Sequence, residues 1–154
     1  MYRFALYPSN HGFGHATRMA ALAAALIDYG IYVYICTDRP EYLYETLPED
    51  KYTYRKCRLD GGVVHKENLM VDLPATRAML LELFSQREEL VAEETLWLRK
   101  EQVDLVIADI PYFIIEAAGY AEVPVFGLSN FDWAFIYQDL FDDDPDMTIL
   151  INTI

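Results

Sequence analysis

Residues 3–37 contain a strand-like run, a glycine-containing loop, a helix-forming run and a second strand-like run in direct succession. The run RFALY (3–7) is apolar, and IYVYICT (31–37) is β-branched and aromatic, as buried strands are. Between them, residues 15–29 are rich in alanine and leucine, and Gly30 follows where a glycine commonly ends a helix. Two strands joined by such a helix form a parallel βαβ unit.

The same alternation continues along the chain. Strands that alternate with helices and read as near-continuous apolar runs predict a parallel sheet covered on both faces. The fold class is therefore a doubly wound, Rossmann-like α/β domain, with the strand at 3–7 in the centre of the sheet. Further strands are predicted at 52–59, 104–108 and 124–128, and further helical segments at 41–47, at 76–100 as one amphipathic helix or a kinked pair, and at 111–121 with Pro111 in the first turn.

The length of 154 residues and the 53% apolar content indicate one domain, spanning 1–154, with a substantial core. The acidic segment DLFDDDPDM (139–147) interrupts the pattern, and TILINTI (148–154) follows it without a predicted partner element. We therefore expect a domain truncated at its C-terminus, with an exposed apolar strip along or beside residues 148–154.

The formal net charge of −13 argues against binding to nucleic acid or to an anionic membrane, because both require clustered Lys and Arg. The longest apolar run, residues 19–27, is far shorter than the roughly 20 residues of a membrane span. The N-terminus lacks the pattern of a secretion signal, so we expect a cytoplasmic location. Cys36 and Cys57 have no ligand-spaced partner and are predicted to be reduced thiols of the core.

The loop SNHGFGHATR (9–18) follows the first strand, at the edge of a parallel sheet where ligands bind. Gly12 and Gly14 let the backbone approach a ligand, and the N–H groups that open the next helix favour an anion. His11, His15 and Arg18 bracket these glycines, so three donor groups can face one crevice.

Other interpretations of the loop remain open. The two histidines could bind a metal, although His65 is in a different loop and no cysteine is nearby. The glycines could belong to a dinucleotide-binding site for NAD, with Thr17 at the third glycine position and Asp38 as the acidic partner. In a purely structural interpretation, His15 caps the helix and His11 is a solvated loop residue.

Three segments resemble one branch of the GT-B glycosyltransferases, which begins G-H-G-F-G-H-A-T-R and also occurs ahead of the kinase domain in plant arabinose kinases. HGFGHATRMAALAAAL (11–26) resembles the first loop and helix of that branch. MVDLPAT (70–76) resembles its V-D-L turn, and residues 104–133 resemble its D-I-P-P unit and N-F-x-W segment. Asn10 stands at the first glycine of the family pattern and Tyr112 at its second proline.

The resemblance implies an N-terminal, acceptor-side domain that works with a second, donor-binding domain. His15 matches the general base of members that attack with a hydroxyl, and Asp109 matches the aspartate that orients this base. A histidine base oriented by a carboxylate is chemically reasonable for activating a sugar hydroxyl. The expected substrate-binding residues are His11, Gly12, Phe13, Gly14, Arg18, Asn130 and Trp133.

Purely structural interpretations are also open for Asp109, Asn130, Phe131 and Trp133. Asp109 could only cap the following helix, and Asn130 could only cap a helix that begins at Phe131. Phe131 and Trp133 could form a stacking wall for an acceptor sugar or could belong to the core.

The expected function is that of the N-terminal half of a glycosyltransferase, inactive without its second domain, which takes sugar from a nucleotide-sugar donor to a hydroxyl acceptor. No cofactor and no metal are expected. The partners are the donor, the acceptor, and either a second GT-B domain in trans or a second copy that associates through the exposed C-terminal edge. A non-catalytic sugar or nucleotide-binding module and an NAD-type domain are the alternatives.

Overall fold

The computed structural model describes residues 1–129 and 131–154, which form a five-stranded parallel sheet in the order β3-β2-β1-β4-β5. The sheet is doubly wound with the first strand in its centre, as predicted. The chain moves to one side of β1 through β2 and β3 and then crosses to the other side, where it forms β4 and β5. The strands are β1 (Arg3–Pro8), β2 (Tyr32–Cys36), β3 (Tyr52–Arg55), β4 (Leu105–Asp109) and β5 (Val125–Gly127).

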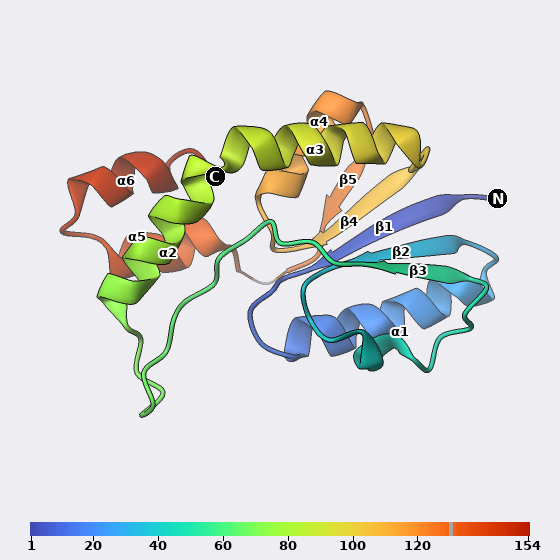
Figure 1. The fold of residues 1–154 in the computed structure, drawn as a ribbon, viewed down its shortest axis with the longest axis horizontal. Coiled ribbons are helices and arrows are strands. Elements are labelled where there is room, and N and C mark those ends of the chain that lie inside the picture. Colours follow the sequence, from blue (N-terminus) through green and yellow to red (C-terminus); the bar gives the residue numbers. More distant parts are fainter. Residues whose placement is uncertain (130) are drawn as a thin grey trace.

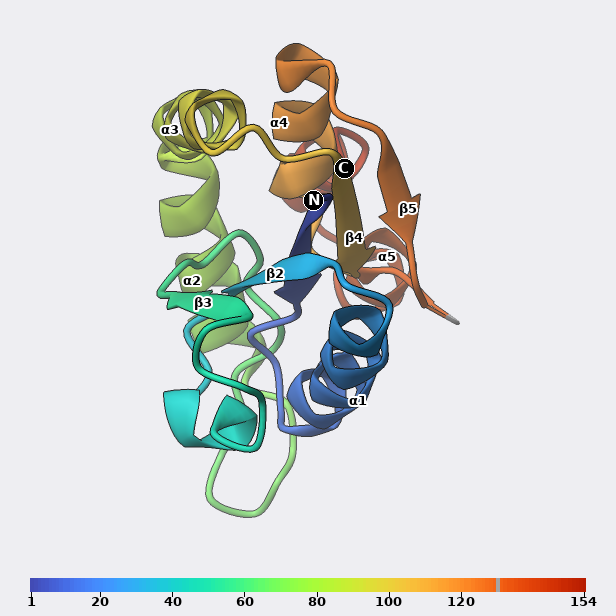
Figure 2. The ribbon, with the colours of Figure 1, turned by 90° about the vertical axis from the view of Figure 1, so that its right-hand side faces the viewer.

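Helices cover both faces of the sheet (Figure 1). The helix α1 (Gly14–Asp28) and the short 3-10 helix η1 (Glu41–Tyr44) lie on one face. On the opposite face lie α3 (Arg87–Lys100) and α4 (Phe113–Ala121), as the rotated view in Figure 2 also shows. The remaining helices gather beyond the carboxyl ends of the strands and are α2 (Leu73–Ser85), α5 (Trp133–Leu140) and α6 (Pro145–Ile151). Within the described ranges, no helix has the length and apolar character needed to cross a bilayer.

The two-residue period of the strands sorts their side chains between the two helical layers. Leu6 of β1 and Ile35 of β2 pack in the layer that contains Met19 of α1. Their neighbours Ala5 and Tyr34 point to the opposite layer, under α3 and α4. Both faces of the central strands are therefore buried, which explains why their sequences are almost continuously apolar.

A buried carboxylate ties α3 to the sheet. Glu94 accepts two hydrogen bonds from Arg55 of β3, at 2.6 and 2.8 Å, and a further one from the hydroxyl of Tyr7. The Arg55 guanidinium in turn lies 4.3 Å from the centre of the Trp97 ring. These contacts place a charged residue in the core with its hydrogen-bonding capacity satisfied.

We expect Glu94→Gln to lower the free energy of unfolding by about 1.5–3 kcal/mol, because a neutral amide loses the charge-assisted bonds from Arg55 and turns an N–H toward one of the donors. Urea denaturation followed by circular dichroism measures this change. Glu93→Gln, at the neighbouring exposed position, is the control and should change stability by less than about 0.5 kcal/mol. Equal effects of the two substitutions would contradict the structural role of Glu94.

The two cysteines are free thiols, as expected. Cys36 is buried in β2, and burial raises the pKa of its thiol to about 12. Cys57 is partly buried, and burial together with the negative charge of Glu94 raises its pKa as well. Both thiols are therefore held in the protonated, unreactive form.

Several predicted boundaries are wrong. The helical segment predicted at 41–47 is the 3-10 helix η1, which ends at Tyr44. The third strand ends at Arg55 and not at residue 59, because β2, its neighbour in the sheet, ends at Cys36 and residues 56–59 leave the ladder. The helix predicted to begin at Pro111 begins at Phe113. Ile110 has a φ of 66°, in the left-handed region, so the chain turns sharply there and Pro111 belongs to the turn.

The segment predicted as one helix or a kinked pair is a pair, α2 and α3, which meet at Gln86. The first of them begins at Leu73, earlier than predicted, because the Asp72 carboxylate accepts a hydrogen bond from the N–H of Ala75 and caps it. The helix α5 begins at Trp133 and not at Phe131. Its cap is Asp132, which accepts from the N–H of Phe135 at 2.8 Å. Asn130, which the structural alternative made the cap, lies outside the described residues.

One part of the expectation for the C-terminal segment is wrong, because this segment has a partner element. It forms α6, whose Met147 and Ile151 are buried against α2 and α5. Of the large apolar side chains of α6, all of whose residues are described, only Ile149 is exposed. Other exposed apolar side chains, Ile115 and Leu128, border a cleft that Ile154 also lines, so an apolar surface lies beside the segment and not along it.

Candidate functional site

The glycine-containing loop leaves β1 at the carboxyl edge of the sheet, between β2 and β4, as predicted. The N–H of Ser9 donates to the carbonyl of Asp109 at the end of β4, which fixes the start of the loop. Gly12 has a φ of 76°, which glycine adopts without strain. The helix α1 begins at Gly14, so His15 lies in its first turn, while Phe13 is its exposed N-cap residue.

His15 and Asp109 meet across this edge. The distance between His15 Nδ1 and Asp109 Oδ1 is 2.9 Å, which is hydrogen-bond length, and the aspartate is fully buried. Two groups lie within hydrogen-bond distance of Nδ1: the Asp109 carboxylate at 2.9 Å, which accepts, and Arg18 Nη2 at 3.2 Å, which can only donate. Because the contact with the carboxylate is the shorter of the two, we assign the proton to Nδ1, which leaves the lone pair on Nε2. The alternative role of Asp109 as a helix cap is not observed, because the N-terminus of α4 has no side-chain cap.

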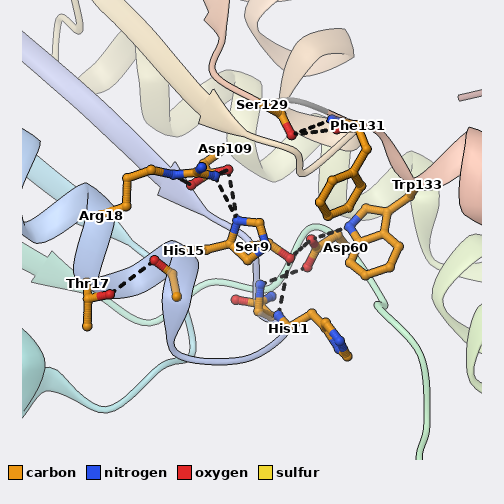
Figure 3. Close-up of polar contacts among 12 residues, drawn as sticks. Ser9, His11, His15, Thr17, Arg18, Asp60, Asp109, Ser129, Phe131 and Trp133 are labelled. Carbon is orange, nitrogen blue, oxygen red and sulfur yellow. Dashed lines mark hydrogen bonds and ion pairs between the residues drawn. The ribbon is translucent and has the colours of Figure 1, made fainter.

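Arg18 binds Asp109 as well, which differs from its predicted role as a free donor to an anion. Its Nε atom donates to Oδ2 at 3.0 Å and its Nη2 atom to Oδ1 at 2.5 Å, a two-bond arrangement typical of arginine and carboxylate. Figure 3 shows the guanidinium and the His15 ring converging on the one carboxylate. Arg18 therefore neutralises and orients Asp109, one turn along the helix from His15.

His11 points away from this pair (Figure 3), so the three predicted donors do not face a single crevice. Its ring stacks on His65 with 5.5 Å between ring centres and meets the Trp133 ring edge-on at 5.3 Å. Burial and the neighbouring imidazoles of His65 and His15 lower the pKa of His11. Within residues 1–129 and 131–154, no three His, Cys, Asp or Glu side chains are placed to hold a metal ion.

Gly62 leaves room for the His11 ring in this packing arrangement with His65 and Trp133. It has a φ of 67°, and a Cβ atom placed on it would lie 2.8 Å from the His11 ring. We expect Gly62→Ala to lower the free energy of unfolding by about 1–3 kcal/mol, through a strained backbone and overpacking. Chemical denaturation measures the loss.

The matched control is Gly119→Ala, in α4, where a Cβ atom would meet nothing within 4 Å and the backbone is helical. This substitution should raise stability by about 0.5–1 kcal/mol. Loss of stability in both variants would mean that the Gly62 effect does not arise from His11.

Asp60 is a site residue that the sequence did not reveal. It is fully buried beside the loop after β1, and it accepts hydrogen bonds from Ser9 Oγ at 2.5 Å, from the N–H of Asn10 at 3.1 Å and from Trp133 Nε1 at 2.9 Å. Burial raises the pKa of its carboxyl group. The available signal was an acidic residue at the end of a strand-like run, a position that Asp109 also occupies.

The two aromatic residues expected to form a stacking wall have different environments. Trp133 is 2% exposed and stacks on Tyr137, so it belongs to the core as the structural alternative held, and it cannot serve as an open wall. Phe131 is exposed and lies edge-on to the His15 ring, with 6.2 Å between ring centres. Of this pair, only Phe131 can contact a ligand beside His15.

An apolar cleft of about 510 Å³ opens beside Phe131, at the carboxyl ends of β4 and β5. This volume falls within the usual range for small-molecule sites. Its walls include Ile110, Ile115 and Leu128, and it adjoins the end of the strand that carries Asp109.

This chain is 33% identical over 138 residues to an L-arabinokinase of Arabidopsis thaliana, a match that covers 88% of this chain and 13% of that protein. No protein-family profile matches it. Among solved structures, Acinetobacter baumannii MurG superimposes with a TM-score of 0.52 and 15% identity, over 84% of this chain and 35% of MurG. LpCGTa, solved in complex with UDP, gives a TM-score of 0.58 and 17% identity, over 96% of this chain and 34% of that chain. The chain has the fold of a GT-B glycosyltransferase domain.

The resemblance to the N-terminal domain of GT-B glycosyltransferases, inferred from three sequence segments, is thus confirmed. The chain spans only about a third of the solved GT-B structures and a smaller share of the curated relative. The dinucleotide alternative gains no support from the site. Asp38, its expected acidic partner, accepts two hydrogen bonds from Arg39 on one carboxylate oxygen, Oδ1.

Proposed function

We propose that this GT-B domain is the acceptor-side half of a glycosyltransferase that moves a sugar from a nucleotide-sugar donor to a hydroxyl group. The observation that carries the proposal is the hydrogen bond from His15 Nδ1 to the buried Asp109 carboxylate. It leaves Nε2 free to take a proton and holds the ring in one orientation. The fold supports the proposal, since LpCGTa, which shares it, was solved with UDP bound.

In the proposed reaction, the acceptor hydroxyl gives its proton to His15 Nε2 while its oxygen forms a bond to the anomeric carbon of the donor sugar. The bond from that carbon to the diphosphate oxygen breaks, and the nucleoside diphosphate leaves with the electron pair. Asp109 stabilises the imidazolium that results, and Arg18 keeps the carboxylate in place.

The acceptor half of the site comes from this chain in our proposal. The cleft beside Phe131 seats the body of the acceptor, and the glycine loop with His11, Gly12, Phe13 and Gly14 borders the path to His15. Asn130 remains a proposed contact on the basis of the sequence resemblance. We further propose that residues 1–154 are one of two domains, and that the donor site is supplied by a second domain, in the same polypeptide or in trans.

A nucleotide-release assay tests the proposal. Mixtures of this chain, candidate nucleotide sugars and hydroxyl acceptors are compared with and without a donor-binding GT-B domain. Acceptor-dependent release of nucleoside diphosphate that requires both domains supports the transferase. Acceptor binding without any turnover by the two-domain assembly supports the non-catalytic module, whose ligand would occupy the same cleft. A rise of the melting temperature with NAD alone would favour the dinucleotide-binding alternative.

A further inference from the structure

Asp60 is a buried carboxylate for which the proposed reaction has no direct use. It lies on the connection between β3 and α2 and is surrounded by three neutral donors, Ser9, Asn10 and Trp133. Across residues 1–129 and 131–154, no Lys or Arg side chain forms an ion pair with it. A buried charge held only by neutral groups is unfavourable by itself, so its place in the structure needs an explanation.

The three donors belong to two segments that are far apart in the sequence. Ser9 and Asn10 open the loop that leads from β1 to His15, and the Ser9 hydroxyl also accepts from the N–H of His11. Trp133 is the first residue of α5. One carboxylate therefore joins the glycine loop to the start of α5, as Figure 3 shows.

Both segments hold the His15 ring. The loop sets where α1 begins and thus where His15 leaves the backbone. Phe131, two residues before the first residue of α5, meets the His15 ring edge-on and meets the Trp133 ring edge-on at 6.2 Å between centres. A shift of Trp133 or of Ser9 would therefore move the ring relative to Asp109.

We infer that Asp60 is a positioning residue, which keeps the His15 imidazole aligned on Asp109 by fixing the glycine loop to the first turn of α5. It acts through Ser9, Trp133 and Phe131 and not by contact with the substrate. The inference rests on the proposed function only in giving this alignment a catalytic purpose. A carboxylate suits the position because it is purely an acceptor, whereas an asparagine would turn an N–H group toward one of the donors.

The test uses Asp60→Asn in the 154-residue chain, followed by nitrogen-15 NMR of the tryptophan and histidine side chains. The chain has two tryptophans, so Trp97 on α3 is an internal control. In Asp60→Asn, the Trp133 indole N–H should shift and exchange with solvent at least about tenfold faster, while Trp97 stays unchanged. The ring nitrogens of His15 should change from a single Nδ1–H tautomer to a mixture.

Asp142→Asn, at an exposed position between α5 and α6, removes the same charge without these contacts and should leave all of these signals as in the wild type. If Asp60→Asn folds and the His15 signals do not change, the inference is wrong. If Asp60→Asn does not fold, Trp133→Phe is tested instead, because it removes only the indole donor to Asp60. Unchanged His15 signals in Trp133→Phe would also overturn the inference.

Activity separates this inference from the proposed function. In a working two-domain enzyme, Asp60→Asn should lower kcat by about 10- to 100-fold with little change in the donor KM, since a misplaced base slows the chemical step. An unchanged kcat overturns the positioning role while sugar transfer stands. A wild-type assembly with no turnover, together with altered His15 signals in Asp60→Asn, refutes the proposed transfer and supports the positioning of His15.

Discussion

Replacing His15 by alanine in the two-domain enzyme should lower kcat by about 10²–10⁴-fold, the usual contribution of a general base, while the KM for the acceptor changes little. The reason is that Nε2 of His15 accepts the acceptor proton only in the transition state. The Nδ1 atom, bound to Asp109 at 2.9 Å, is not available for that purpose. Steady-state kinetics with a saturating donor measures the change.

The 154-residue chain by itself provides the baseline for this experiment. Base catalysis is only part of the rate enhancement, and the rest requires a donor and an acceptor held in line. We therefore expect no measurable transfer and at most weak nucleotide-sugar binding from the isolated chain, with activity restored when a donor-binding domain is fused to it or added in trans. Robust turnover without a second domain would refute the proposed division of the site.

His65→Ala is the matched control, because it removes an imidazole that stacks on His11 and makes no contact with Asp109. Its kcat should stay within about threefold of the wild type. An active assembly in which His15→Ala performs as well as His65→Ala would show that another group takes the proton.

The fold could be predicted because it follows from short-range patterns, whereas His15 and Asp109 were chosen through the resemblance to the GT-B branch, and the predicted topology explains why they meet. Apolar runs alternate with helix-forming runs, which specifies a parallel sheet, and the carboxyl ends of parallel strands share one edge. His15 opens the helix after β1 and Asp109 ends β4, the strand paired with β1, so the topology brings them together. No knowledge of loop packing was needed for this step.

The rest of the site depends on how loops pack against one another, which spacing in the sequence does not express. Arg18 was expected to bind an anion from solution, but a buried carboxylate within its reach binds it more favourably. His65 was placed in a different loop from His11, yet the two loops meet because Gly62 leaves room for the His11 ring. Asp60 is important only through donors from two distant segments, none of which is evident from its own neighbours in the sequence.

Replacing Asp109 by asparagine should lower kcat by about 10²–10⁴-fold in the two-domain enzyme, although the shape of the side chain is kept. An asparagine can present an N–H group to His15 Nδ1, which moves the imidazole proton to Nε2 and removes the lone pair that acts as the base. It also weakens the two hydrogen bonds from Arg18, which should lower the free energy of unfolding by about 1.5–3 kcal/mol.

Asp104→Asn is the control, since Asp104 directly precedes β4, at its opposite end, and its carboxylate accepts only from the N–H of Arg3 among the contacts of the described residues. The control should keep the wild-type kcat. Because Asp109 sets the tautomer in our proposal, the ring nitrogens of His15 should report a proton on Nε2 in Asp109→Asn and a proton on Nδ1 in Asp104→Asn. A low kcat with an unchanged His15 tautomer would mean that Asp109 supports the reaction by its charge and not by orienting the base.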